Sequence, residues 1–262
     1  MNRDWRIELA QSDNVSVISY LEKDAIRNAL NIWYLQRGEK GFELRVCRIG
    51  DEVKAHLSIY DTPEAVYIDL GGESSAARSL LHLVPSKAVL ITTDELRDVV
   101  TRELKFDKIY SNDIMVVRRG EEKLKSPDSA TRLSRKHDVE YSTFGSSFNV
   151  PAVPIEWIRE RLDNDIIYGA FADSTLASVA SLVAWLPEVA VIMGVETRPE
   201  FRRRGFGSIA VSSAVREALK LSQCCSLFVR SDNEQAIGLY RALGFRKIGE
   251  ELWVDIGTGM IP

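Results

Sequence analysis

The stretch with the clearest chemical potential is a run of arginines and glycines between an apolar segment and a helix-like one. The run reads Arg202, Arg203, Arg204, Gly205, Phe206, Gly207 and Ser208. Amide groups in the first turn of a helix lack intrahelical partners and lie at the positive end of the helix dipole. Glycines let the backbone approach a ligand closely, and arginines add forked donors. The run therefore predicts a binding site for a phosphate-type anion at the start of a helix.

Two elements must position this anion site. Residues 189–195, which precede it, are almost continuously apolar and predict a short strand covered on both faces. The residues after it carry apolar side chains at helical spacing as far as Leu221, which predicts a helix. The run lacks the Lys-Ser/Thr pair of a Walker A loop, and Ala210 stands where a Rossmann fingerprint needs its third glycine.

A second group of polar residues lies further along the chain. Asn233, Ala236 and Tyr240 are spaced so that they share one face of a predicted helix. Ser231 and Glu234 form a capping-box pattern at its start, and the chain has a glycine stop signal at its end. The hydroxyl of Tyr240 is neutral at pH 7 and could donate a proton, and a core tyrosine bonded to a carbonyl is the alternative interpretation.

The two segments resemble motifs of one known family. Thr197 to Gly207 resembles the acyl-CoA-binding motif of the GCN5-related N-acetyltransferases (GNATs), which reads Arg/Gln-x-x-Gly-x-Gly/Ala after a central strand. Ser231 to Phe245 is similar to that family's Asn-x-x-Ala-x-x-Tyr-x-x-x-Gly-Phe signature. The motifs occur in the family's order, and the resemblance covers about residues 130–255.

The resemblance has implications for the fold. It implies an α/β (α+β) protein in which a mixed, mostly antiparallel twisted sheet is flanked by helices, with a V-shaped splay of two strands for acyl-CoA. The catalytic domain would span 128–262. The first half, 1–120, repeats the order of strands and helices, but it lacks the anion motif after Leu70 and has Thr101 in place of Tyr240. We therefore expect tandem GNAT-like domains, the first one degenerate and without a cofactor site, joined by a linker over 119–129.

The resemblance also implies an activity, the transfer of an acetyl or other acyl group from acetyl-CoA to a primary amine by direct attack. The implied cofactor-binding residues are Val195, Glu196, Thr197, Arg202, Arg203, Arg204, Gly205, Phe206, Gly207, Ser208, Asn233, Ala236 and Tyr240. Tyr240 is the implied general acid to the CoA thiolate, and a backbone N–H of 195–197 would polarise the thioester carbonyl. Glu196 is the candidate general base and Glu188 is another; either carboxylate could instead be a solvated group at a strand end.

Two further functions stay open. A non-catalytic acyl-CoA-binding regulatory protein would keep the cofactor site without turnover. An aminoacyl transferase with paired domains of this fold would use aminoacyl-tRNA, but such enzymes lack a working pyrophosphate site. The sequence leaves the acceptor open among a peptide amine, a lysine side chain, an amino acid, a polyamine and an aminoglycoside, and it leaves acyl chain length and a monomeric or homodimeric state open too.

The composition limits the remaining function classes. With 262 residues, 45% apolar residues, 27% charged residues and a net charge of -4, the chain is typical of a water-facing protein of two domains. This charge favours a small anionic ligand over nucleic acid. No apolar run approaches the roughly 20 residues of a membrane span, and the N-terminus lacks a signal-peptide pattern, so we expect a cytoplasmic protein with no membrane partner. Three cysteines and three scattered histidines predict buried thiols and no metal site.

Overall fold

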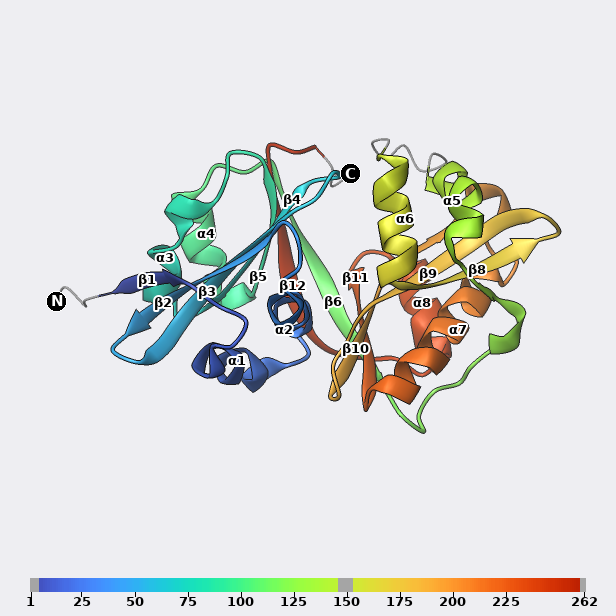
Figure 1. Cartoon of the computed structure of the whole chain (residues 1–262), viewed down its shortest axis with the longest axis horizontal. Helices are drawn as coiled ribbons and strands as arrows, with labels where there is room; N and C mark the ends of the chain where they lie inside the picture. The colour runs from blue at the N-terminus through green and yellow to red at the C-terminus, as the bar shows by residue number, and fades with distance from the viewer. Residues whose placement is uncertain (1–4, 146–152, 260–262) are drawn as a thin grey trace. The chain divides into compact units, whose positions relative to one another are not determined.

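The computed structural model describes residues 5–145 and 153–259, and the contacts within the chain define two compact units (Figure 1). The first unit comprises Met1–Asp113 with Gly249–Pro262, and the second comprises Ile114–Ile248. The predicted domain ranges, 1–120 and 128–262, differ from these units in their treatment of the last strand. The predicted linker also lies within the second unit, where the Arg119 guanidinium donates to the carbonyls of Leu219 (2.8 Å) and Ser222 (3.0 Å).

The first unit is a mostly antiparallel sheet with helices on both faces. Its sheet order is β1-β2-β3-β4-β5-β12, and only β4 and β5 are parallel neighbours. The strands are β1 (Arg6–Leu9), β2 (Phe42–Ile49), β3 (Glu52–Asp61), β4 (Val66–Gly72), β5 (Ala88–Thr92) and the greater part of β12 (Arg246–Ile256); β6 (Lys108–Arg118) begins in this unit. The helices are α1 (Val15–Leu21), α2 (Ala29–Arg37), α3 (Ser74–Arg78) and α4 (Arg97–Glu103), with short 3-10 turns at Glu22–Asp24, Leu81–Leu83 and Asp94–Leu96.

The second unit has the same kind of architecture. Its sheet order is β11-β10-β9-β8-β7, and only β10 and β11 are parallel neighbours. The strands are β7 (Thr131–Arg132), β8 (Ile166–Ala172), β9 (Thr175–Trp185), β10 (Val189–Thr197) and β11 (Cys224–Arg230). The helices are α5 (Asp138–Gly145), α6 (Ile155–Asn164), α7 (Phe206–Leu221) and α8 (Glu234–Ala242), with 3-10 turns at Pro127–Ser129, Arg135–His137 and Pro199–Phe201.

Helices cover both faces of the second unit's sheet. Helix α7 buries a stripe of small apolar residues, which includes Ala210, Ala214 and Ala218, against β8 to β11. Helices α5 and α6 lie on the opposite face, where Phe144 and Ile158 pack with Leu176 and Val179 of β9 and other apolar residues (Figure 1). The α7 face and the α5/α6 face of this sheet are therefore separate environments.

Both units repeat one order of elements. A hairpin (β2–β3 or β8–β9) leads to a third antiparallel strand (β4 or β10), a helix (α3 or α7), a parallel strand (β5 or β11) and another helix (α4 or α8). This shared order confirms the predicted tandem arrangement and the mixed, mostly antiparallel sheets. It also allows each element of the second unit to be compared with a counterpart in the first.

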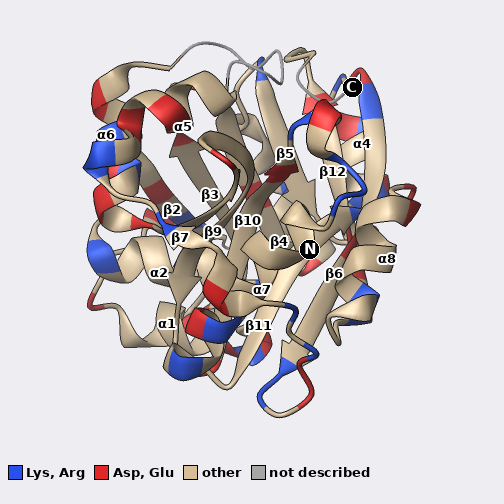
Figure 2. Ribbon diagram, turned by 90° about the vertical axis from the view of Figure 1, so that its right-hand side faces the viewer, with Lys and Arg blue, Asp and Glu red and all other residues tan. Residues whose placement is uncertain are grey.

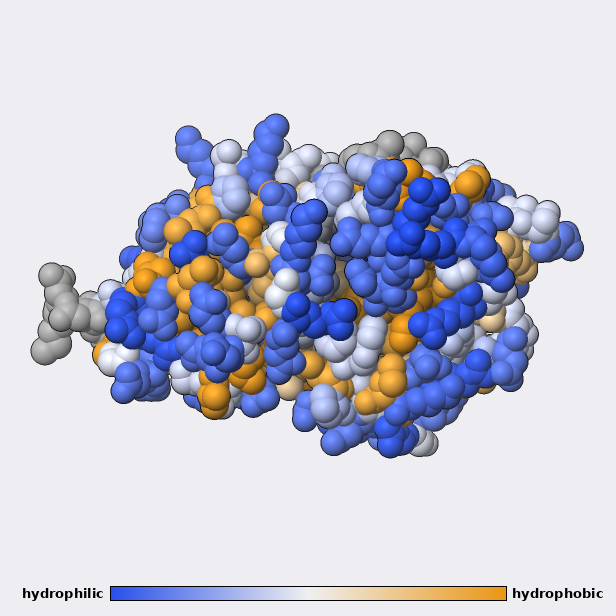
Figure 3. Space-filling view, viewed as in Figure 1, coloured by the Kyte–Doolittle hydropathy of each residue, from blue (hydrophilic) through white to orange (hydrophobic). Residues whose placement is uncertain are grey.

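The surface carries charge of both signs. Lys and Arg residues are interspersed with Asp and Glu along the ribbon (Figure 2), and hydrophilic residues cover most of the face seen in Figure 3. Large apolar side chains that are exposed within the described ranges are Ile7, Leu9, Val15, Val139, Leu221 and Ile248. None of the helices in these ranges has the length and apolar character needed to cross a bilayer.

Candidate functional site

The predicted anion site lies at the amino-terminal end of α7. The helix begins at Phe206, and Gly205 precedes it in the left-handed region with φ 89°. No side chain among the described residues caps this helix. A Cβ on Gly207 would approach Thr197 Oγ1 to 3.1 Å and Leu239 Cδ1 to 3.3 Å, so the first turn packs directly on β10 and α8. The amides of this turn remain available to an anion.

The three predicted arginines are exposed and differ in their contacts. Arg202 donates through Nε to the carbonyl oxygen of Thr197 at 3.2 Å. Arg203 adopts φ 59°, an uncommon conformation for a residue other than glycine. The Arg204 guanidinium lies 5.3 Å from the ring centre of Phe201 and 5.5 Å from that of Phe206. The loop thus places three cations before the free amides of α7.

Strand β10 loses its regular pairing as it approaches this loop. Its parallel pairs with β11 run from Val189 with Cys224 to Ile192 with Leu227, and both strands continue past the last pair. On the other edge Met193 pairs with Ser181 and Glu196 with Val179, so β10 carries an extra residue at a bulge. Gly194 in this bulge has φ 57°. The bulge therefore interrupts the regular backbone pairing between β10 and β9.

Hydroxyl groups fix the end of β10 that follows the bulge. Buried Ser178 donates through Oγ to the carbonyl oxygen of Glu196 at 2.7 Å. A serine has one hydroxyl hydrogen, so the 2.8 Å bond between the Ser178 and Thr197 hydroxyls must have Thr197 as its donor. These two bonds hold the backbone of Glu196 and Thr197 beside the start of α7.

The second predicted group lies on α8, but the helix begins differently from the prediction. The N-cap is Asn233, whose Oδ1 accepts a hydrogen bond from the Ala236 amide at 3.1 Å, and not Ser231 of the predicted capping box. The cap therefore uses the amide oxygen of Asn233, while its NH2 group stays exposed. The fold brings the two motifs together, because Leu239 of α8 is the residue nearest to Gly207 from that helix.

Tyr240 is almost fully buried in the core beneath α7. Its side chain is 5% exposed, and its ring centre lies 5.8 Å from that of Phe245. Burial raises the pKa of Tyr240 above its ordinary range, so the phenol stays protonated at neutral pH. No hydrogen bond to its hydroxyl is made by the residues that the structure describes. A protonated phenol with an unused donor suits the predicted role of proton donor.

The two candidate bases lie at opposite ends of β10. Glu188 is exposed just before the strand, roughly 26 Å along it from Glu196 at the usual rise per residue. Glu196 is half-buried and pairs with Val179, so both side chains are on the α5/α6 face. Of the two carboxylates, only Glu196 is near the start of α7.

Two polar residues that the sequence did not single out share this face. Ser181 is fully buried, and its hydroxyl has no hydrogen-bond partner in the described part of the chain. Arg198 follows β10, and its guanidinium lies over the ring of Phe144. The only sequence signal for either was alternation along a strand, and the bulge at Gly194 interrupts that alternation.

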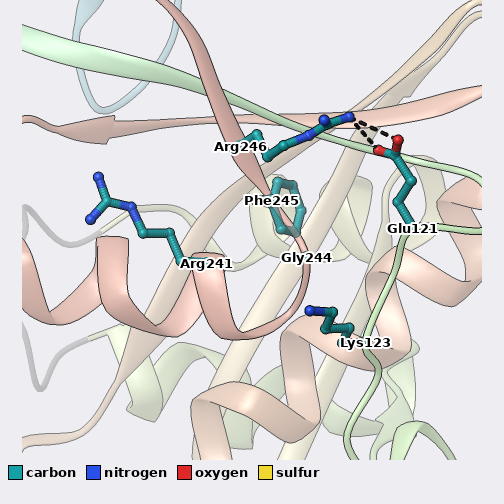
Figure 4. Close-up of a pocket in the computed structure, with 6 residues that line it drawn as sticks. All are labelled: Glu121, Lys123, Arg241, Gly244, Phe245 and Arg246. Atoms are coloured by element: carbon teal, nitrogen blue, oxygen red, sulfur yellow. Dashed lines mark hydrogen bonds and ion pairs between the residues drawn. The ribbon is translucent and has the colours of Figure 1, made fainter.

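A separate pocket of about 330 Å³ lies at the carboxy-terminal end of α8 (Figure 4). Its lining residues are Glu121, Lys123, Arg241, Gly244, Phe245 and Arg246. The close-up shows Arg246 directed at Glu121, and both carboxylate oxygens accept from its NH2 group at 2.8 Å. The carboxy-terminal end of α8, which lines this pocket, is the negative end of the helix dipole. That end disfavours a pyrophosphate. None of the predicted site residues lines it.

In the first unit, side chains link the two parallel strands that correspond to β10 and β11. The last parallel pair of β4 and β5 is Asp69 with Ile91. Just beyond it, the carbonyl oxygen of Leu70 accepts from Thr92 Oγ1 at 2.9 Å and from the Arg27 guanidinium at 3.3 Å. Arg27 also donates to both carboxylate oxygens of Asp69 at 3.3 Å. Side-chain hydrogen bonds therefore connect β4 and β5 just beyond their last pair, whereas β10 and β11 continue for several residues beyond theirs.

The cysteines are buried, and the described His, Cys, Asp and Glu side chains are dispersed. Cys47, Cys224 and Cys225 are buried free thiols, as predicted, and burial raises the pKa of each. No cluster of three or more His, Cys, Asp or Glu side chains that could hold a metal ion occurs in those ranges.

Comparisons with known proteins agree with this fold. A model of the FR47-like protein family matches residues 168–254, which include most of β8, all of β9 to β11 and both motif helices. No curated protein matches the sequence. Solved structures with the same fold include a Drosophila protein (TM-score 0.72, 13% identity, 95% of this chain and 97% of that one covered). Another is a tandem GNAT protein from the clavulanic acid biosynthesis pathway (0.62, 14%, 97% and 99%). A third is a GNAT-family acetyltransferase from Colwellia psychrerythraea (0.59, 12%, 95% and 99%).

Proposed function

Since the chain has the tandem fold of the GCN5-related N-acetyltransferases, a fold that supports acyl transfer, we propose that its second unit moves an acetyl group from acetyl-CoA to a primary amine. The observation that carries the proposal is the uncapped start of α7, which packs through Gly207 against both β10 and α8. The same turn therefore adjoins both the bulged strand β10 and the helix that bears Tyr240.

Acetyl-CoA would bind along the end of β10 and the start of α7. The amides of Phe206, Gly207 and Ser208 would hold the pyrophosphate, with charge from the preceding arginines. The pantetheine arm would follow Val195 to Thr197 in a V-shaped opening, where β10 and β11 run past their last pair. An amide of the bulge would polarise the thioester carbonyl.

Transfer needs two proton movements and no covalent enzyme intermediate. The amine nitrogen forms a bond to the acyl carbon as the carbon–sulfur bond breaks. Tyr240, whose phenol is protonated at neutral pH, gives its proton to the departing thiolate. Glu196 takes the proton that leaves the amine, directly or through a water molecule.

Two measurements test this proposal. Isothermal titration with acetyl-CoA tests the cofactor site, and release of free thiol in the presence of a panel of amines tests transfer. Binding together with amine-dependent thiol release supports the transferase. Binding without thiol release for any amine supports a non-catalytic acyl-CoA-binding protein, and the absence of binding contradicts both functions.

A further inference from the structure

The end of β10 separates two faces with different chemistry. Thr197 pairs with Ser178, and its hydroxyl contacts the α7 side. Glu196 pairs with Val179, which belongs to the apolar cluster under α5 and α6. The cofactor would lie on the first of these faces. The second face is therefore the side from which an acceptor can reach Glu196.

Arg198 presents a nearly desolvated cation on that second face. Its side chain is 15% exposed, and its guanidinium carbon lies 5.6 Å from the ring centre of fully buried Phe144. The nearest carboxylate is that of Glu200, 3.9 Å from NH1 and 58% exposed. The Nε–H group is buried and has no hydrogen-bond partner within the described ranges.

These contacts do not compensate for the loss of water around the guanidinium. Contact with an aromatic face attracts the cation but supplies no hydrogen bond. An exposed pair at the distance of Glu200 contributes little, because solvent screens it. The buried Nε–H group has lost its water without gaining a hydrogen bond, and neither contact replaces that bond. The arrangement of Arg198 is therefore one that an anionic group of a ligand would complete.

The neighbouring groups indicate where that ligand lies. Glu196 and Arg198 are alternate residues of one extended segment, and Ser181, with its unpartnered hydroxyl, lies on the same face before the bulge. Glu196 is thus flanked by a hydroxyl and a guanidinium. An amine held at Glu196 would have its anionic substituent toward Arg198.

We propose that the acceptor is an amine that also bears a carboxylate, such as a free amino acid or a short peptide, and that Arg198 binds this carboxylate. The planar fork of arginine matches the two oxygens of a carboxylate. A polyamine or an aminoglycoside carries further positive charges, which Arg198 would repel. The inference rests on the proposed transferase function, since Arg198 binds the acceptor and takes no part in the bond exchange.

The first experiment compares matched acceptors on the native protein. Rates of acetyl-CoA-dependent thiol release are measured for a set of amino acids and for the corresponding amino acid amides. A charge-assisted hydrogen bond is worth roughly 1.5–3 kcal/mol, so the best amino acid should exceed its amide by about 10- to 100-fold in kcat/KM. Equal rates, or faster rates with the amides or with polyamines, would overturn the inference.

The second experiment alters the arginine. Arg198→Met should raise KM for the amino acid by about 10- to 100-fold, leave kcat/KM for the amide within about 2-fold, and so abolish the preference. Arg198→Lys keeps the positive charge and should retain part of the preference for the amino acid over its amide. Arg203→Met is the matched control, since it removes an exposed arginine of the α7 loop and should change acetyl-CoA affinity without changing the acid-to-amide ratio.

The outcomes separate this inference from the proposed function. Loss of acetyl-CoA binding in the native protein would contradict the transferase itself. Acetyl-CoA binding and transfer to amides as fast as to amino acids would contradict only the role of Arg198. Circular dichroism of Arg198→Met shows whether the variant folds, and the comparison on native protein decides the inference if it does not.

Discussion

Gly207 and Thr197 lie so close together that a Cβ on the glycine would come within 3.1 Å of the threonine hydroxyl oxygen. The same Cβ would approach Leu239 to 3.3 Å. One glycine therefore lets α7 begin in contact with both β10 and α8. This contact joins the two sequence motifs into one candidate site.

Gly207→Glu should abolish acetyl-CoA binding. The new side chain would be crowded by Thr197 and Leu239, and its charge would repel a pyrophosphate at the helix start. Gly238→Glu is the matched control, because Gly238 is exposed on α8 and a Cβ there has no atom within 4 Å. Titration calorimetry should show binding by the control and none by Gly207→Glu. Unchanged affinity in Gly207→Glu would remove the pyrophosphate from this helix.

Tyr240→Phe should lower kcat by roughly 10²-fold or more, with little change in acetyl-CoA affinity. The substitution removes a hydroxyl that no described residue binds, so the free energy of unfolding should change by less than about 1 kcal/mol. Tyr168→Phe, at another buried tyrosine of the second unit, should leave kcat unchanged. A kcat within 2-fold of native in Tyr240→Phe would exclude the phenol as the proton donor.

The elements that could be predicted from the sequence were those with local sequence patterns. Strand β10 and helices α7 and α8 were located to within a few residues, because apolar periodicity and glycine signals at element ends are local. Helices α1 and α2 were not predicted. One reason is that α2 buries Asn31 as well as Ile32 and Leu35, so its inner face is not uniformly apolar.

The candidate site was predictable only for residues within motifs. The α7 loop and Tyr240 follow recognisable spacings. The face on which Arg198 lies depends on the bulge, which makes Met193 and Glu196 face the same side although regular alternation would separate them. Strand pairing decides where such a bulge forms, and Gly194 was its only local sign. The α8 cap shows the same limit, because Ser231 and Asn233 are both good capping residues.

Glu251 should make the stability of the first unit depend on pH. Its carboxyl group is 3% exposed, and burial raises its pKa from the ordinary 4.5 to about 7. Between these pKa values the folded state holds a proton that the unfolded state has already released. The free energy of unfolding therefore falls as pH rises from about 4.5 to about 7, and it stays at the lower value above pH 7. The shift corresponds to a few kcal/mol.

Glu251→Gln should remove this dependence. The glutamine keeps an oxygen that can accept the 2.6 Å hydrogen bond from Trp253 Nε1, but it carries no charge. Urea unfolding at pH 5 and pH 8 should show a variant more stable than native at pH 8 and nearly equal at pH 5. Glu250→Gln, at the exposed neighbouring residue, is the control. Parallel pH profiles for native protein and Glu251→Gln would show that Glu251 ionises normally in the folded state.

The bridge across β4 and β5 leads to a prediction about stoichiometry. Thr92 and Arg27 satisfy the Leu70 carbonyl in the first unit, whereas β10 and β11 of the second unit run past their last pair, where we propose that acetyl-CoA binds. We expect one acetyl-CoA per chain. Titration calorimetry of the native protein should give a stoichiometry near 1, and a value near 2 would contradict the prediction.

A matched pair of variants then identifies the unit that binds. Ser208→Glu places a carboxylate in the first turn of α7, and Ser75→Glu does the same in α3. A negative charge near a helix start stabilises the helix in both cases, so neither variant should lose its fold. Ser208→Glu should weaken acetyl-CoA binding by at least about 10-fold through repulsion of the pyrophosphate, and Ser75→Glu should leave it unchanged. The reverse pattern would assign the acyl-CoA to the first unit.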